Sequence, residues 1–182
     1  MTKPRLLVHT CCAPDGLYVM DLLRDEYEAS AFFYNPNIFP AEEYGRRLED
    51  AERVARLKGF PLVVDAWDHE RWLGMTLRFK DEPEMGRRCD ICYAARLDRT
   101  GRVAACRGFD LFTTVMSLSP HKNAKSLNRI GRMLGRKHGV GFLEADFKKK
   151  DGFHKSVRLS RDLDLYRQDY CGCSFSRRQP AS

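Results

Sequence analysis

The cysteines of this sequence fall into three close pairs, which gives them the spacing of metal ligands. The paired thiols are six of the seven cysteines in the chain: Cys11, Cys12, Cys89, Cys92, Cys171 and Cys173. A C-x-x-C pair alone is compatible with zinc, an iron–sulfur cluster or a redox dithiol, but three pairs in one chain favour a shared metal site. Gly172, between the last two cysteines, permits the tight backbone that chelation by a C-x-C pair requires. The remaining cysteine, Cys106, fits the role of a small buried hydrophobic residue.

The stretch HTCCAPDG, residues 9–16, combines two adjacent thiols with Asp15 directly after an apolar run. Asp15 stands three residues after Cys12, so its carboxylate could serve as an oxygen ligand beside the thiolates. It also immediately precedes GLYVMDLL, where an aspartate is a favoured N-cap of a helix. Position alone leaves both roles open, and the adjacent thiols favour ligation.

The number of paired thiols predicts two metal centres. A cubane cluster or a structural zinc takes four thiolates, which leaves two of the six thiols over. Vicinal side chains tend to point in different directions, so Cys11 and Cys12 could each serve a different centre. We therefore predict a four-thiolate cluster beside a single metal held by two thiolates and Asp15, with Cys11, Cys12 and Asp15 as the catalytic group. The cluster ligands are expected among Cys12, Cys89, Cys92, Cys171 and Cys173.

Short apolar runs and longer helical segments alternate along the chain and must position these ligands. Residues 5–10, 29–34, 61–66, 110–116 and 140–145 have the composition of strands. Residues 16–27, 41–58, 91–106 and 122–138 have the periodicity of helices. This alternation predicts an α/β fold with a doubly wound parallel sheet that is covered on both faces. We expect one domain over residues 1–182, with a basic, metal-ligating part at 121–176 and a tail at 177–182.

Polar loops after the first, second and fourth strands should meet at the carboxyl edge of such a sheet, where ligands bind. The second of these loops, YNPNIFP, offers Tyr34, Asn35 and Asn37. Their phenol and amide groups suit a polar ring or a ribose, although turns of this composition are also ordinary loop chemistry.

The third loop, SLSPHKN, has Ser119 and Pro120 at the expected start of a helix. The free N–H groups of that helix, with Lys122 and Lys125 nearby, would suit a phosphate. An ordinary capped helix with a basic face has the same pattern. Two histidines beside these loops, His9 and His121, are possible acids, bases or ligands, although a lone histidine is more often structural.

The charge of the chain is unevenly distributed. Its net charge is +7, and residues 121–182 hold 15 Lys or Arg against 6 Asp or Glu. A polyanionic partner such as nucleic acid accounts for this excess, and so does a soluble basic surface. The lysine run in DFKKKDGFHKS, residues 146–156, is interpreted in the same two ways, as a solvated loop or as a strip that contacts phosphates.

The chain has the length of one domain and needs no disulfides to stabilise a core at 182 residues. No apolar run approaches the length of a membrane span, and the N-terminus has too short an apolar segment for a signal peptide. We therefore expect a cytoplasmic protein with free thiols and no membrane contact.

Six stretches of the chain together resemble the cobalamin-independent epoxyqueuosine reductases, the QueH family. They are HTCCAPDG, YNPNIFPAEEYGRR, RRCDICYAARL, SLSPHKN, DFKKKDGFHKS and LYRQDYCGCSFS, and they follow the order of the family from about residue 5 to residue 176. The resemblance implies a Rossmann-like fold of the adenine nucleotide alpha hydrolase type. It also implies the last step of queuosine synthesis, in which the epoxide of epoxyqueuosine at the tRNA wobble position is reduced to an alkene.

The resemblance further implies a [4Fe-4S] cluster and an additional iron nearby, with the six paired cysteines as metal ligands. Many members of the family have a third cysteine, in CCAPC, where this chain has Asp15. A carboxylate at this position is compatible with an iron ligand. The loop TCCAPDG lacks the Gly- and Ser-rich character of a phosphate loop, so ATP use is not expected.

The reaction that the resemblance implies needs two electrons, two protons and a group that holds the epoxide oxygen. We expect an external low-potential electron donor, an open position on the second metal for the oxygen, and a proton from water, Tyr34 or His9. The anticodon loop of tRNA is the expected partner, held through Tyr34, Asn35, Asn37, Ser119 and Lys122. The alternatives are a zinc-dependent RNA-binding module without catalysis and a thiol redox enzyme that uses Cys89 and Cys92.

Overall fold

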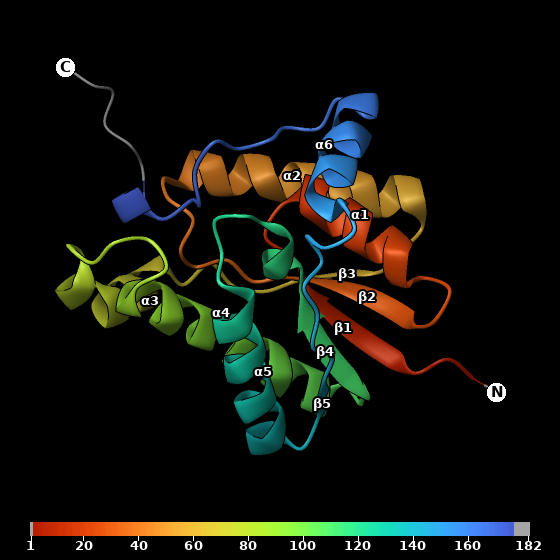
Figure 1. Ribbon diagram of the computed structural model, residues 1–182, viewed down its shortest axis with the longest axis horizontal. Helices are drawn as coiled ribbons and strands as arrows, with labels where there is room; N and C mark the ends of the chain where they lie inside the picture. Colours follow the sequence, from red (N-terminus) through yellow and green to blue (C-terminus); the bar gives the residue numbers. More distant parts are fainter. Residues whose placement is uncertain (1, 177–182) are drawn as a thin grey trace.

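A computed structural model describes residues 2–176 of the protein (Figure 1). The strands in this part of the chain are β1 (Arg5–His9), β2 (Glu28–Phe33), β3 (Leu62–Val64), β4 (Leu111–Thr114) and β5 (Gly141–Phe142). The α-helices are α1 (Ala13–Leu23), α2 (Ala41–Lys58), α3 (His69–Thr76), α4 (Arg87–Cys106), α5 (Ala124–His138) and α6 (Gly152–Asp162). Short 3₁₀ segments are η1 (Leu77–Phe79), η2 (Val115–Leu118) and η3 (Ser174–Ser176). The predicted tail at 177–182 lies outside the described residues.

The five strands form one parallel sheet in the order β3-β2-β1-β4-β5. This order confirms the predicted doubly wound α/β fold. The order of the strands reverses between β1 and β4, because the chain proceeds outward from β1 to β3 and then returns to β4 on the other side. Ligands of such sheets bind at this switch point, beyond the carboxyl ends of the two strands.

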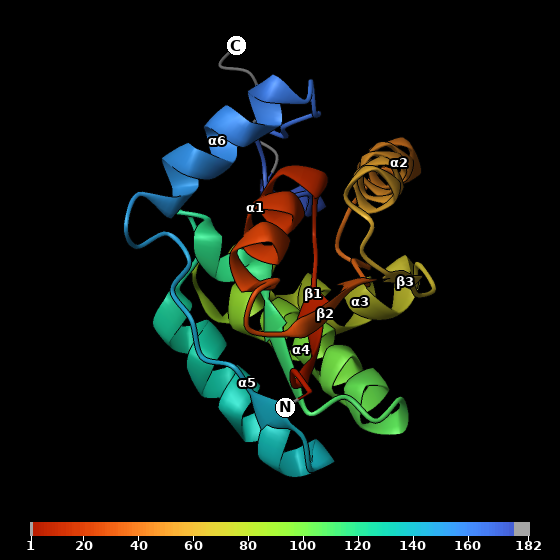
Figure 2. The same ribbon diagram turned by 90° about the vertical axis from the view of Figure 1, so that its right-hand side faces the viewer.

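Helices cover both faces of the sheet, as Figures 1 and 2 show. The alternation of side chains along β1 assigns Leu7 to one face and Leu6 and Val8 to the other. Leu7 packs into a core with residues of α4 and α5, whereas Leu6 and Val8 pack with residues of α1. α6 lies against α1, and α2 also packs on the α1 side, where Val54 contacts the same cluster as Leu17. All these strand residues are fully buried, which is typical of a parallel sheet.

Several helix boundaries differ from the prediction in ways that affect the site. α1 begins at Ala13 rather than at residue 16, because Pro14 occupies its first turn, where a missing N–H costs nothing. α4 begins at Arg87 rather than at residue 91 and so includes both cysteines of the C-x-x-C pair. The prediction that Ser119 and Pro120 open a helix is wrong: α5 begins at Ala124, and the Asn123 side chain caps it by accepting hydrogen bonds from the N–H groups of the first turn.

Two helices, α3 and α6, were not predicted from the sequence. α6 follows the lysine run and has few apolar residues, so its pattern is that of a solvated loop. Its buried side is made of small residues, Gly152, Ser156 and Ser160, which carry little hydrophobic signal. Within residues 2–176 no helix is both long and apolar enough to cross a membrane.

Candidate functional site

The predicted ligands gather at the carboxyl edge of the sheet near the switch point. Cys11 and Cys12 directly follow β1, and Cys12 is the N-cap residue of α1. Cys89 and Cys92 lie in the first turns of α4. The third pair, Cys171 and Cys173, lies in the segment that follows α6, and all seven cysteines of the chain are free thiols.

Cys11, Cys12 and Asp15 form a compact group. The two Sγ atoms and a carboxylate oxygen of Asp15 all lie within 4.8 Å of one another. The vicinal thiols therefore do not point apart but face the same carboxylate. Two thiolates and one carboxylate are a donor set that suits a transition metal ion.

Asp15 does not cap α1, because it is the third residue inside the helix. Its Oδ1 accepts hydrogen bonds from Ser156 Oγ at 3.2 Å and from Arg167 Nη2 at 3.3 Å. Burial raises the pKa of Asp15, against the opposing effect of the Arg167 charge. The unpredicted helix α6 thus contributes directly to the site, since Ser156 anchors one oxygen of this carboxylate.

The pKa values of the Cys11 and Cys12 thiols shift in opposite directions. The hydrogen bond from the Cys12 thiol lowers the pKa of Cys11 to about 6, whereas the same bond and burial raise the pKa of Cys12 well above its usual value. Cys11 is therefore the more readily ionised thiol, and a thiolate is the form that binds metal. Gln168 also hydrogen-bonds Cys12 and favours its thiolate.

The remaining four thiols lie near one another. Cys92 and Cys173 are buried and pack in the same cluster, and the charge of Cys171 acts on the pKa of Cys89, Cys92 and Cys173. Burial raises the pKa of each of these three thiols, that of Cys173 to about 11. Four thiolates in a buried setting need compensating positive charge or metal.

Two cations, the half-buried Lys122 and the buried Arg96, supply part of this positive charge. Lys122 Nζ donates a hydrogen bond to Cys171 Sγ at 2.9 Å. Burial alone would raise the pKa of Cys171, but the charge of Lys122 and this hydrogen bond lower it. Arg96, one turn beyond Cys92 on α4, is 1% exposed, and its pKa is raised by the neighbouring cysteines despite burial.

Hydrogen bonds to backbone carbonyl groups hold the segment with Cys171 and Cys173 in place. Arg47, which is 1% exposed, donates from Nη1 to the carbonyl of Cys171 and from Nη2 to that of Tyr170, both at 3.3 Å. Phe39 N donates to the carbonyl of Gly172 at 2.9 Å. Gly172 has a φ of 101°, a backbone conformation that residues other than glycine rarely adopt. This confirms the prediction that Gly172 allows the tight turn between the two cysteines.

Trp72 has a buried donor that faces a thiol. Its side chain is 1% exposed and packs against Cys92 and Cys173. Its Nε1 finds no hydrogen-bond partner among the described residues, yet it lies close enough to Cys92 to lower the pKa of that thiol. A buried N–H without a partner is costly, so a negatively charged Cys92 sulfur is the acceptor that would satisfy Trp72.

A cavity of about 220 Å³ opens beside the group of Cys11 and Asp15. Of the predicted substrate contacts, Ser119 and Lys122 line it, as does His121. Sequence reasoning missed further lining residues, among them Arg96, Phe153, Arg167, Gln168 and Tyr170. Three of these occur in LYRQDYCGC, where their place next to a ligand pair was the available signal.

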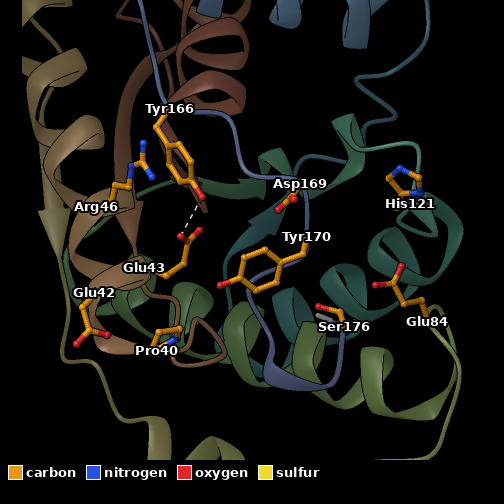
Figure 3. Close-up of a pocket in the computed structure, with 10 residues that line it drawn as sticks. All are labelled: Pro40, Glu42, Glu43, Arg46, Glu84, His121, Tyr166, Asp169, Tyr170 and Ser176. Atoms are coloured by element: carbon orange, nitrogen blue, oxygen red, sulfur yellow. Dashed lines mark hydrogen bonds between the residues drawn. The ribbon is translucent and has the colours of Figure 1, made fainter. Parts of the chain in front are cut away.

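A larger hollow of about 660 Å³ adjoins this cavity and shares His121, Asp169 and Tyr170 with it. Figure 3 shows the residues around this hollow, with Tyr166 and Glu43 on one side and His121 on the other. Tyr166 Oη donates to Glu43 Oε2 at 3.0 Å. The cavity at the thiols thus adjoins a second hollow, here called the vestibule, whose walls carry hydroxyl and carboxylate groups.

The loop after β2 contacts residues next to the site but does not line the cavity. Asn35 is fully buried, donates from Nδ2 to the carbonyl of Thr10 at 2.9 Å, and accepts from Arg96 Nη2 at 2.7 Å. Among the residues that line either hollow, neither Tyr34, Asn35 nor Asn37 occurs. The structure therefore does not bring these three predicted contacts to the cavity.

His9 and Asn37 are both buried, but among the described residues only His9 has side-chain hydrogen-bond partners. Burial and the Arg96 charge lower the pKa of His9 well below its usual value, and its Nδ1 lies 2.9 Å from Thr114 Oγ1. His9 is thus a neutral residue of the sheet edge. Asn37 is fully buried, and both of its side-chain polar atoms lack a partner within the described part of the chain.

Comparison with known proteins identifies relatives over nearly the whole chain. The family model described as epoxyqueuosine reductase QueH matches residues 6–179. The epoxyqueuosine reductase QueH of Thermotoga maritima is 38% identical over 174 residues, which cover 94% of this chain and 89% of the relative. That of Streptococcus pyogenes is 33% identical over 180 residues, which cover 96% and 71%.

Two solved structures share the fold at low sequence identity. The U34-tRNA thiolase NcsA from Methanococcus maripaludis, solved with its [4Fe-4S] cluster, superposes with a TM-score of 0.61 at 15% identity, covering 97% of this chain and 62% of the thiolase. A structure described as the predicted subunit of a tRNA methyltransferase from Methanocaldococcus jannaschii has a TM-score of 0.57 at 14% identity, covering 84% of this chain and 76% of that one. This likeness places the sheet and its helices in a known architecture.

Proposed function

The chain belongs to the epoxyqueuosine reductase QueH family, and from this membership we propose how its residues support the reaction. It is an oxidoreductase of tRNA modification. Reduction of the epoxide of epoxyqueuosine to an alkene consumes two electrons and two protons and releases the oxygen as water. The site must therefore admit electrons, hold the epoxide oxygen and keep the modified base in place.

The four thiols of Cys89, Cys92, Cys171 and Cys173 are the proposed ligands of a [4Fe-4S] cluster. Two observations support the fit. Four neighbouring thiols match the ligand number of a cubane, and the buried N–H of Trp72, which has no hydrogen-bond partner among residues 2–176, lies beside Cys92. Arg96 and Lys122 offset the negative charge that four ligating thiolates bring into a buried site.

Cys11, Cys12 and Asp15 are the proposed ligands of a second, single iron. Their ligand atoms lie within 4.8 Å of one another at the wall of the cavity. Ser156 and Arg167 fix one oxygen of Asp15, as residues beyond the ligands commonly do in metal sites. When bound, the two groups supply single electrons and an open coordination position for an oxygen atom.

The residues of the chain itself position the substrate. The vestibule admits the modified base, and the cavity brings it against Cys11 and Asp15. Ser119 and Lys122 are the proposed substrate contacts that line this cavity. Of the three proton sources considered, Tyr34 and His9 do not line the cavity, which leaves water as our proposal.

The proposed partners are a tRNA anticodon loop and an external low-potential electron donor. A base in a single-stranded loop can be turned out and inserted into a cavity without the cost of breaking a base pair. Seven free thiols are consistent with a cytoplasmic location, where thiols stay reduced.

The observation that carries this proposal is the group of Cys11, Cys12 and Asp15 at the wall of the cavity. The test is mass analysis of nucleosides from tRNA that carries epoxyqueuosine, before and after incubation with the reduced protein. We expect conversion to queuosine, with a loss of one oxygen. Intact epoxyqueuosine after incubation with metal-loaded, chemically reduced protein would contradict the proposal.

A further inference from the structure

The outer face of α6 and the turn before it carry an excess of unpaired positive charge. Lys149 and Lys150 lie in the turn, and Lys155, Arg158 and Arg161 lie on the helix. All five are exposed. None of their side chains has a hydrogen bond or an ion pair with another of residues 2–176. We call these five residues the basic ridge.

The basic residues of α5 differ from those of the ridge. Three of them are held in ion pairs with acidic residues: Arg129 with Asp90, Arg132 with Glu144 and Lys137 with Asp98. α5 also leads away from the site, because its last residue precedes β5 and so lies near the amino edge of the sheet. In Figure 2, α5 and α6 lie at opposite ends of the molecule.

α6 borders the cavity at the thiols. Phe153, in its first turn, lines the cavity, and Ser156 hydrogen-bonds Asp15. Arg167 lies over the Phe153 ring at 5.1 Å and so joins the helix to the segment that bears Cys171. The inner side of α6 thus belongs to the site, and its outer side is free for a partner.

The spacing of the ridge fits a nucleic-acid backbone. Residues 155, 158 and 161 repeat every three positions and share one face of the helix. They extend over about 9 Å at about 1.5 Å per residue, which is the rise of about three phosphates in one strand of a duplex. Exposed, unpaired Lys and Arg side chains bind such phosphates by releasing counterions.

We propose that the basic ridge binds backbone phosphates of the tRNA anticodon stem-loop and so holds the wobble nucleotide over the cavity. The inference rests on the proposed function, which makes tRNA the substrate. It narrows the interaction surface from the whole basic third of the chain to one side of one helix. It also assigns α6 two roles, because its inner residues hold Asp15 and its outer residues hold the RNA.

The test compares two double variants that remove the same charge. K155Q/R158Q changes the ridge, and R132Q/R136Q changes exposed residues of α5. Affinity for an anticodon stem-loop RNA and for full tRNA is measured with the full chain at several salt concentrations. Circular dichroism and thermal midpoints verify that both variants are folded.

We expect K155Q/R158Q to lose about tenfold or more in affinity for both RNAs and to reduce the slope of log K against log salt by about 1.5 to 2. R132Q/R136Q should bind within about twofold of the unaltered protein. Equal losses in the two variants, an unchanged salt slope in K155Q/R158Q, or a loss for full tRNA without a loss for the stem-loop would each overturn the inference. Conversion of epoxyqueuosine by the unaltered protein is measured separately, so a failure of the ridge and a failure of the reductase proposal are distinguishable.

Discussion

Replacing Gly172 by alanine should release the segment that carries Cys171 and Cys173. The φ of Gly172 is 101°, and a Cβ there would lie 3.0 Å from Ile38 Cγ1 and 3.1 Å from Arg47 Nη1. The backbone strain costs about 1–3 kcal/mol, and displacing the two neighbours adds about 1 kcal/mol or more. We therefore expect opening of this segment to become more favourable by about 2–4 kcal/mol, which is a factor of roughly 30 to 1000.

The assay is the alkylation rate of Cys173 in the metal-free, reduced protein, followed by mass spectrometry. Cys173 is 6% exposed, so reagent reaches it when the segment opens. Two glycines serve as controls: Gly139 has a φ of 69° with nothing near a Cβ, and Gly74 lies in α3 with open space around it. Neither G139A nor G74A should change the rate. Alkylation of Cys173 in G172A at the unaltered rate would refute the argument that this turn requires glycine.

Three further predictions concern single side chains. Trp72→Phe keeps an aromatic ring but removes the N–H that would donate to a ligating Cys92. For a hydrogen bond worth about 1 kcal/mol, the midpoint potential of the bound cluster should become more negative by about 40 mV, with unchanged iron content. An unaltered potential in an EPR-monitored titration would contradict this. Ser156→Ala removes one of the two donors to Asp15 Oδ1 and leaves Arg167 as the other. Anaerobic titration with Fe²⁺ should show a loss of about 10- to 100-fold in affinity at the single-metal site, and unchanged affinity would count against this role. The hydrogen bond from Arg99 lowers the pKa of Asp65 below its ordinary value of 3.8, so this pair stabilises the fold at neutral pH, and the effect is lost as the pH falls from 3.8 through the lowered pKa. The unfolding free energy of Asp65→Asn should be about 1 kcal/mol lower than that of the unaltered protein at pH 7, and the difference should shrink as the pH falls through this range. A difference that does not change with pH would exclude this linkage.

The parallel sheet was predictable because its strands are buried apolar runs separated by helical segments. Fully buried strands such as β1 and β4 have a strong signal, whereas the short edge strands β3 and β5 begin and end within a few residues of the predicted runs. α6 was missed because small residues form its buried side, and burial of Ser156 depends on Pro14 and Asp15, which are distant in sequence.

The gathering of the three thiol pairs and Asp15 was predictable from residue type and spacing, but the residues that support them were not. Arg96 and Arg47 look like surface arginines in a helical pattern, yet both are 1% exposed. Apart from Glu43, which lies one turn before Arg47 on the same helix, their partners are carbonyl groups and side chains of other segments, which a sequence does not bring together. For the same reason the sequence does not show that Tyr34, a predicted substrate contact, is buried and lines neither hollow.

Anaerobic analysis of iron and acid-labile sulfide tests the central claim most directly. If the six paired thiols and Asp15 hold a four-iron cluster and a single iron, as we propose, the reconstituted protein should contain about five iron atoms and about four sulfide ions per chain. About one metal ion per chain, with no sulfide, would contradict it and would leave a zinc-type site in its place.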